Sequence, residues 1–203
     1  MPPPCLGLTG GIGAGKSLAL GVFAACGAAT LSADEVVHRL YERPEVVAAV
    51  VERFGPPALD DRGGVDRAAL GELAFAQAGG AAYLEGLIHP RVGVERTAWQ
   101  AEQVGRRPPP PLLVCEVPLL FEVGLEDQFD AILVVTASEA VRRERVRARG
   151  QAFVARSARQ IDEDEKVALA DHAYVNDGPL DDLRAWVAER FAEYAGRSCE
   201  AAG

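Results

Sequence analysis

A glycine-rich octapeptide near the start of the chain limits the possible folds more than any other feature. Residues 10–17 read GGIGAGKS and match the phosphate-binding loop pattern G-x-x-x-x-G-K-[ST]. The short apolar run Cys5–Thr9 precedes this loop, and Lys16–Cys26 is predicted to be a helix. Because strand, loop and helix follow in the order that the motif requires, the sequence predicts an α/β protein that binds a nucleotide through its phosphates. A glycine-rich turn with an accidental GKS is the alternative interpretation.

The backbone of the loop and two of its side chains are expected to bind the phosphates and the metal ion. Glycines permit backbone angles that other residues avoid, so several N–H groups can converge on one anion. Lys16 is expected to neutralise the β- and γ-phosphates, and the Ser17 hydroxyl is expected to ligate Mg²⁺. These assignments predict a site for a nucleotide with its metal, and they leave the reaction open.

Four further short apolar segments are predicted to be strands. They lack the polar alternation of a half-exposed strand, which indicates a parallel sheet covered on both faces. Helical segments alternate with them, as is typical of parallel pairing. The segments are Ala28–Leu31, Leu112–Cys115, Ala131–Val135 and His172–Val175.

The chain between residues 35 and 105 has little strand signal, which predicts an inserted helical subdomain. Pro44 is expected to separate two helices there, and Pro90 to begin a new helix. Further helices are predicted over Ser138–Arg149, Ala152–Ile161, Glu163–Ala170 and Pro179–Tyr194.

Acidic residues at two predicted strand ends are candidates for work on the phosphates. Ligands of open α/β sheets bind beyond the carboxyl ends of the strands, and Asp34 follows the second strand. Asp34 is a candidate to accept or orient the proton of an attacking hydroxyl, and Glu116 to reach Mg²⁺ through water. A structural role is the alternative for Asp34, because Ser32 and Glu35 form a capping-box pattern around it.

A basic segment interrupts an otherwise acidic chain. The net charge of −9 argues against a general nucleic-acid surface, yet seven arginines and one acid lie between Arg142 and Arg159. Their spacing places Arg142, Arg145 and Arg149 on one helix face, which indicates a local anion site. A solvated basic face is the alternative.

The cysteines and the apolar runs of the sequence indicate in which cellular compartment the protein is expected. The four cysteines form no C-x-x-C pair, and all of them, Cys5, Cys26, Cys115 and Cys199, are expected to be reduced and structural. No apolar run approaches the ~20 residues of a membrane span. The N-terminus does not read as a signal peptide, so a cytoplasmic location is expected.

Short motifs spread over residues 5–190 resemble those of the dephospho-coenzyme A kinase family. The phosphate loop alone is generic, whereas its LTGGIG start, the pair His89-Pro90 and the PLLFE run of residues 118–122 are together specific to that family. The remaining matching positions are Ala33-Asp34, Phe54-Gly55, Asp66-Arg67, Arg156, Gln160, Lys166, Ala170-Asp171 and Asn176.

The resemblance implies a P-loop kinase fold with a five-stranded parallel sheet, helices on both faces, a helical substrate-binding insertion and a lid. It implies ATP-dependent phosphorylation of the ribose 3′-hydroxyl of dephospho-coenzyme A, the last step of coenzyme A synthesis. The expected partners are these small molecules with Mg²⁺, without nucleic acid or membrane, and a monomer is favoured. The implied division of the single domain 1–203 is a core of about 1–33, 108–140 and 170–196, a substrate subdomain of about 34–107 and a lid of about 141–169.

The resemblance also implies roles for individual residues. Those expected to be catalytic are Asp34, Lys16, Arg145 and Arg149. Those expected to contact ATP are Gly11, Gly13, Ala14, Gly15, Lys16, Ser17, Leu18 and Asn176. Those expected to bind the acceptor are Asp34, His89, Pro118, Leu119, Leu120 and Glu122, and those expected at the metal are Ser17 and Glu116.

The sequence departs from the family pattern at three places. Leu18 stands where a threonine is usual, Leu31–Asp34 lacks the first acid of the family's I-D-A-D, and the lid after Arg149 is a few residues shorter. Two other functions stay open: a kinase for another small acceptor, such as a nucleotide or shikimate, and a GTP-binding switch. The second would use an N-K-x-D motif, which the sequence lacks.

Overall fold

The computed structural model describes residues 1–148 and 160–199, and its contacts divide the chain into two units. The first unit comprises Met1–Ser32 and Gln100–Gly203, and the second comprises Ala33–Trp99. Most of the predicted helix Ala152–Ile161 lies outside the described residues. Among the helices that are described, none is long and apolar enough to cross a bilayer.

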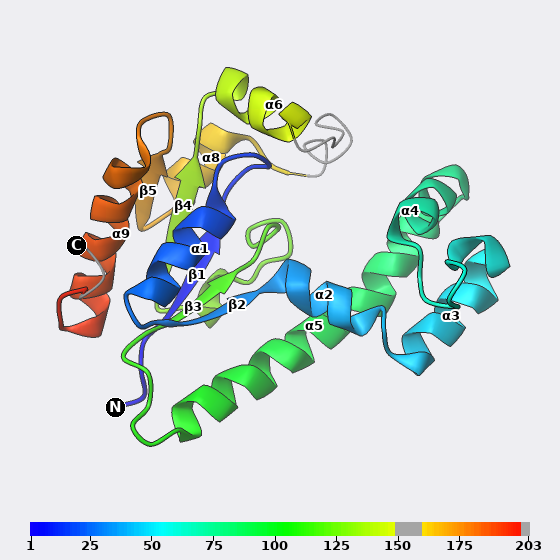
Figure 1. Ribbon diagram of the computed structural model, residues 1–203, viewed down its shortest axis with the longest axis horizontal. Helices are drawn as coiled ribbons and strands as arrows, with labels where there is room; N and C mark the ends of the chain where they lie inside the picture. Colours follow the sequence, from blue (N-terminus) through cyan, green and yellow to red (C-terminus); the bar gives the residue numbers. More distant parts are fainter. Residues whose placement is uncertain (149–159, 200–203) are drawn as a thin grey trace. The chain divides into compact units, whose positions relative to one another are not determined.

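A five-stranded sheet in the order β2-β3-β1-β4-β5 forms the centre of the first unit (Figure 1). Every neighbouring pair of strands is parallel, which confirms the predicted fold class. The strands are β1 (Cys5–Thr9), β2 (Ala29–Ser32), β3 (Leu113–Glu116), β4 (Ala131–Thr136) and β5 (His172–Val175).

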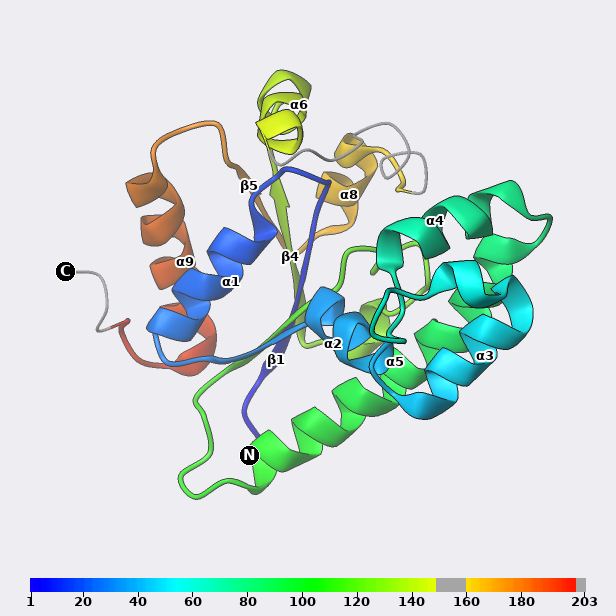
Figure 2. The same cartoon turned by 45° about the vertical axis from the view of Figure 1, so that its right-hand side comes forward.

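Helices cover this sheet and form the second unit (Figures 1 and 2). The described helices of the first unit are α1 (Lys16–Ala25), η2 (Glu126–Gln128), α6 (Glu139–Ala148), α8 (Glu163–Leu169) and α9 (Leu180–Ala195). Those that belong wholly or mostly to the second unit are α2 (Ala33–Leu40), α3 (Pro44–Phe54), η1 (Pro56–Ala58), α4 (Arg67–Ala76) and α5 (Gly80–Gly105).

Alternate residues of β4 show how the sheet is buried on both faces. Successive side chains of a strand point to opposite faces. Leu133 belongs to the apolar cluster that contains Phe23 of α1 and Phe191 of α9. Its neighbour Ile132 belongs to a separate cluster with Leu120 from the segment after β3. The uninterrupted apolar sequence of β4 is therefore explained by burial on both sides.

Helix α5 corrects the prediction that a new helix begins at Pro90. It runs without a break over Gly80–Gly105, with Pro90 inside. An interior proline removes one backbone hydrogen bond and costs about 3 kcal/mol, which is why a boundary was expected. The proline leaves the carbonyl of Gly86 without its helical donor, and the side chain of Arg91 donates to the next carbonyl, that of Leu87, at 2.6 Å. His89 consequently lies in mid-helix and is exposed, not at a helix start.

The expectation that all four cysteines are reduced is wrong for two of them. Cys26, which follows α1, and Cys199, which follows α9, form a disulfide. Their Cα atoms are 4.7 Å apart, within the range that a disulfide can bridge. Cys5 and Cys115 are buried on neighbouring strands, as expected of small apolar side chains, with their sulfurs 4.0 Å apart.

Candidate active site

All five strands carry a buried polar residue at or directly after their carboxyl ends. Four of these residues close a strand, and the fifth follows β5. Burial of a polar group is costly unless a hydrogen bond or a ligand satisfies it. This edge is also where open α/β sheets bind ligands. The residues are Thr9, Ser32, Glu116, Thr136 and Asn176.

The phosphate loop is fixed to the end of β5. Gly15, at the start of α1, has φ +108°, and a Cβ atom there would lie 2.2 Å from Asn176 Nδ2. Asn176 is 3% exposed, and its Nδ2 donates to the carbonyl oxygen of Ala14 at 2.8 Å. Glycine is therefore needed at position 15 both for its backbone angle and for the close approach of Asn176. The contact of Asn176 with ATP stays a prediction, and its contact with the loop is observed.

Lys16 lies against the loop that it follows. Its Nζ donates to the carbonyl oxygens of Gly10 at 2.9 Å and Gly11 at 3.1 Å. Ser17, in the first turn of α1, is exposed. The positive charge and the N-terminal end of α1 thus lie together at this loop, an arrangement that favours a polyphosphate.

Two oxygen-bearing side chains fit Mg²⁺. The hydroxyl of Ser17 and the carboxylate of Glu116 are hard donors of the kind that this ion prefers. Glu116 ends β3 and accepts from the Ser32 hydroxyl at 3.3 Å. Within the described residues no group of three or more His, Cys, Asp or Glu forms a metal cage. Mg²⁺ usually takes few protein ligands and completes its shell with water and phosphate oxygens.

Two arginines of α6 lie at the phosphate loop. The first, Arg145, donates through Nη1 to the carbonyl oxygens of Gly13 and Ala14, each at 3.4 Å, and through Nη2 to that of Asn176 at 3.0 Å. Its guanidinium therefore reaches the loop from a helix far away in the sequence. Arg149, the other arginine expected to be catalytic, lies outside the described residues, as does Arg156.

The second arginine, Arg142, forms with Glu163 a contact with the loop that the sequence did not predict. Arg142 Nη1 lies 3.8 Å from Glu163 Oε1, and the Thr136 hydroxyl donates to the other oxygen of Glu163. A Cβ atom at Gly11 would lie 2.3 Å from Glu163 Oε1 and 2.7 Å from Arg142 Nη1. The pair consequently packs directly on the loop, and only the spacing of Arg142 from Arg145 hinted at it.

Some residues of the PLLFE run pack or hydrogen-bond inside the protein, and others are predicted only to contact the acceptor. Leu120 is buried against β4, and Glu122 Oε1 accepts from the backbone N–H of Ile161 at 3.0 Å. The same oxygen lies 3.1 Å from Nζ of the buried Lys166. Pro118 and Leu119 are half-buried. A role of these residues toward the acceptor stays a prediction, whereas the structural role of Leu120 and Glu122 is observed.

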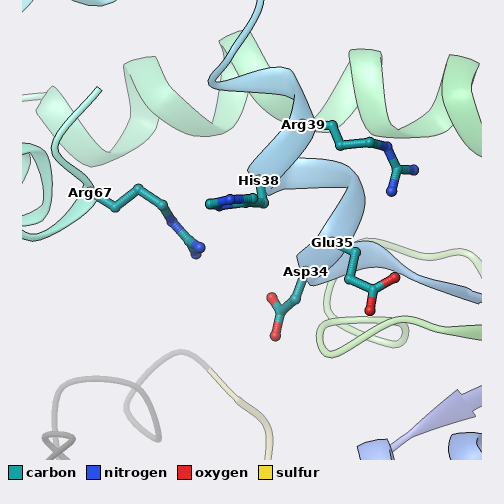
Figure 3. Close-up of a pocket in the computed structure, with 5 residues that line it drawn as sticks. All are labelled: Asp34, Glu35, His38, Arg39 and Arg67. Carbon is teal, nitrogen blue, oxygen red and sulfur yellow. The ribbon is translucent and has the colours of Figure 1, made fainter. Parts of the chain in front are cut away.

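Asp34 lies in a pocket of the second unit (Figure 3). It belongs to the first turn of α2 and shares a cavity of about 430 Å³ with Glu35, His38, Arg39 and Arg67. Figure 3 shows Arg67 reaching from a separate segment toward the side of α2 that carries His38 and Asp34. A carboxylate beside basic side chains suits an alcohol that also carries negative charge.

The N-cap of α4 fixes the backbone from which Arg67 reaches this pocket. Asp66 caps α4 by accepting from the backbone N–H groups of Ala68 at 2.9 Å and Ala69 at 3.1 Å. Burial raises the pKa of the nearby Tyr41 hydroxyl, and the Arg67 guanidinium opposes that rise. His89 is not among the described residues that line the pocket.

The fold and the loop together define the class of protein. A parallel five-stranded sheet with a phosphate loop after β1, a lysine on that loop and an arginine from a later helix is the arrangement of a P-loop kinase. The family model for dephospho-CoA kinase matches residues 4–182. The chain belongs to the dephospho-CoA kinase family.

Individual relatives agree with this assignment. The dephospho-CoA kinase of Frankia casuarinae is 36% identical over 196 residues, which are 95% of this chain and 84% of the relative. That of Deinococcus radiodurans is 39% identical over 185 residues, 89% of this chain and 87% of the relative. A crystal structure of a Thermus thermophilus protein is 32% identical, covers 95% of this chain and 98% of its own, and superposes with a TM-score of 0.77. The structure of the dephospho-CoA kinase from Campylobacter jejuni is 22% identical and superposes with a TM-score of 0.65. It covers 96% of this chain and 99% of its own, and at this identity it supports the fold alone.

Proposed function

We propose that this enzyme transfers the γ-phosphoryl group of ATP to the ribose 3′-hydroxyl of dephospho-coenzyme A, which yields ADP and coenzyme A. The observation that carries the proposal is the match of the dephospho-CoA kinase model to residues 4–182, a span that includes the phosphate loop, Asp34 and Arg145. Family membership sets the reaction class, and the residues of the two units provide groups for each step.

The phosphate loop binds the nucleotide. Backbone N–H groups of the phosphate loop and the Lys16 ammonium surround the β- and γ-phosphates. Ser17, and Glu116 through water, would hold Mg²⁺, which would supply positive charge that neutralises the phosphate oxygens. Such binding leaves the γ-phosphorus exposed to attack from the side opposite ADP.

Asp34 serves the acceptor. Its carboxylate orients the 3′-hydroxyl and receives the proton as the acceptor oxygen bonds to the γ-phosphorus. The bond between that phosphorus and the β–γ bridging oxygen breaks, and ADP keeps the electron pair. Arg39 and Arg67 of the same pocket suit the negatively charged part of the acceptor.

Arg145 stabilises the transferring group. The arginine spans Gly13, Ala14 and Asn176, so its guanidinium stays close to the loop that holds the γ-phosphate. Charge on the equatorial oxygens of the transition state is met by this group and by Lys16. Residues 141–169, with Arg149, act in the proposal as the lid, and residues 34–107 as the acceptor-binding part.

A coupled assay of ADP release with a panel of acceptors tests the proposal. Dephospho-coenzyme A should stimulate ADP release from ATP, while AMP, adenosine and shikimate should not, and the product should carry its new phosphate on the ribose 3′-oxygen. Equal stimulation by another acceptor, or a preference for GTP with no acceptor effect, would overturn it. Light scattering after gel filtration, together with fractionation of cells, tests the accompanying proposal of a cytoplasmic monomer.

A further inference from the structure

One glutamine joins the phosphate loop to the segment that follows β3. Gln160 Oε1 accepts from the backbone N–H of Ile12 at 3.2 Å. Its Nε2 donates to the carbonyl oxygen of Pro118 at 3.0 Å and lies 3.5 Å from that of Gly10. A carboxamide is the neutral side-chain head that both accepts and donates, so a single residue can bridge an N–H group and carbonyl groups in this way.

Buried contacts fix the backbone beside Gln160. The N–H of Ile161 donates to Glu122 Oε1 at 3.0 Å, and Lys166 Nζ lies 3.1 Å from the same oxygen. Lys166 is fully buried, so loss of its partner would leave an uncompensated charge. Gln160 is thus anchored on the side of α8, which lies beside β4 in Figures 1 and 2. Its side chain reaches the loop from a fixed position.

The contact falls on Ile12, in the first half of the loop, directly after Gly11, on which Glu163 and Arg142 pack. Ala14 is fixed by Asn176, and Gly13 and Ala14 are contacted by Arg145. The N–H of Ile12 donates to Gln160, and this bond holds the backbone directly before Gly13 and the later loop amides that can face an anion. The carbonyl of Gly10 also accepts from Lys16, so Gln160 and Lys16 meet at one oxygen.

We propose that Gln160 is a positioning residue for phosphoryl transfer: it holds the first half of the phosphate loop in register with the segment Pro118–Glu122. This inference rests on the proposed function and adds a residue to it. Arg145 and Asn176 contact Gly13 and Ala14 without Gln160, so loss of Gln160 should disturb the alignment of the γ-phosphate more than the binding of ATP. Misalignment of reacting groups by about 1 Å costs on the order of 10²-fold in rate.

Gln160→Met tests the proposal, because methionine keeps the volume of the side chain and removes its hydrogen bonds. We expect kcat with dephospho-coenzyme A to fall by about 10- to 100-fold, with less than a roughly threefold change in the Kd of Mg·ATP. The matched control is Gln77→Met, which removes a half-buried glutamine of the other unit that accepts from Arg53. Gln77 does not line the pocket of Asp34, so both constants should stay unchanged. Normal kcat for Gln160→Met, or a parallel loss of kcat and ATP binding, would overturn the proposal.

Amide hydrogen exchange separates a failure of this inference from a failure of the proposed function. It is measured on the peptide around residue 12, without any acceptor. Exchange should be faster in Gln160→Met than in the wild type and in Gln77→Met, whatever the acceptor proves to be. Unchanged exchange overturns the role of Gln160. A wild-type enzyme that ignores dephospho-coenzyme A instead overturns the proposed function.

Discussion

Asp34 is the residue on which the proposed chemistry of the acceptor depends. It is exposed in the first turn of α2, and no hydrogen bond to it is seen among the described residues, so Asn can replace it without loss of a structural contact. We expect Asp34→Asn to lower kcat by about 10²–10⁴-fold, because the amide cannot accept the proton of the attacking hydroxyl. Steady-state kinetics with dephospho-coenzyme A measure the change, and thermal melting checks the fold.

The adjacent Glu35 provides the control for that experiment. It is exposed, belongs to the same helical turn and lines the same pocket. Glu35→Gln should therefore retain kcat within a few-fold of the wild type. Near-normal turnover by Asp34→Asn would remove Asp34 from the mechanism, and an equal loss in both variants would indicate a general effect of charge in the pocket.

Arg145 and Arg143 offer a matched pair on one helix. Arg145 contacts the loop, whereas Arg143 is exposed and pairs with Glu139 at 2.6 Å. We expect Arg145→Ala to lower kcat by about 10³-fold, since the transferring phosphoryl group loses a cation held in place. Arg143→Ala should change kcat little, because its ion pair lies on the exposed side of the helix and contributes at most about 1 kcal/mol to stability. Equal kinetics of the two variants would contradict the assignment.

Single residues were predictable where the chemistry is local. Lys16 and Ser17 follow from eight consecutive residues, and Asp34 from its place after a strand. Gln160 and Glu163 could not be assigned a contact with the loop, because their partners lie about 150 residues away and only the fold brings them together. Contacts across such a separation leave no local pattern in one sequence.

At the scale of the element, the glycine that precedes α1 can be compared with a glycine inside the helix. Gly15 begins the helix with φ +108°, and its missing Cβ leaves room for Asn176 Nδ2, whereas Gly21 lies in the exposed interior of the helix, where an added Cβ would meet nothing within 4 Å. We expect Gly15→Ala to destabilise the fold by roughly 2–4 kcal/mol, the sum of backbone strain and a disturbed buried hydrogen bond. Gly21→Ala should instead stabilise it by about 0.5–1 kcal/mol.

Denaturant unfolding of both variants measures these changes in the free energy of unfolding. Gly15 is the N-cap residue of α1, where alanine gains no helix propensity, so that gain is expected for Gly21→Ala alone. A stabilised Gly15→Ala would show that Asn176 and the loop can rearrange at little cost, which would weaken the description of a rigid phosphate loop.

Elements were predicted well where periodicity alone determines them. All five strands appear within a residue or so of the expected limits; β1, β3 and β4 are buried along their whole length, whereas the edge strand β5 alternates half-buried and exposed residues. The break expected at Pro90 was wrong: α5 continues through it, held before the proline by the bond from Tyr83 to the Ala49 carbonyl and after it by the ion pair of Glu95 with Arg43. Local preference is decisive only where packing does not override it.

At the scale of the whole molecule, the parallel sheet was predictable and the covalent link was not. Alternation of apolar strands with helices leads to few topologies, and the phosphate loop selects among them. The cysteines of the disulfide are 173 residues apart, and neither lies in a pattern that distinguishes a paired cysteine from a small apolar residue. Their proximity follows from the packing of α1 against α9 in one apolar cluster.

The disulfide makes a prediction for the stability of the entire fold. It closes a loop of 173 residues, and a cross-link over so long a loop restricts the unfolded chain strongly. Replacement of Cys26 and Cys199 by serine should lower the free energy of unfolding by roughly 2–5 kcal/mol, which corresponds to a fall in Tm of about 4–20 °C for a chain of this size. Differential scanning calorimetry of the oxidised wild type and the double variant measures the difference.

A reductant separates the cross-link from the substitutions. It should lower the Tm of the wild type toward that of the double variant and leave the variant itself unchanged, since the buried Cys5 and Cys115 take no part in the bond. Thiol titration of the denatured wild type should count two thiols before reduction and four afterwards. Four thiols at the outset would show that Cys26 and Cys199 remain reduced, and the packing of α1 against α9 would then hold the end of the chain without a covalent bond.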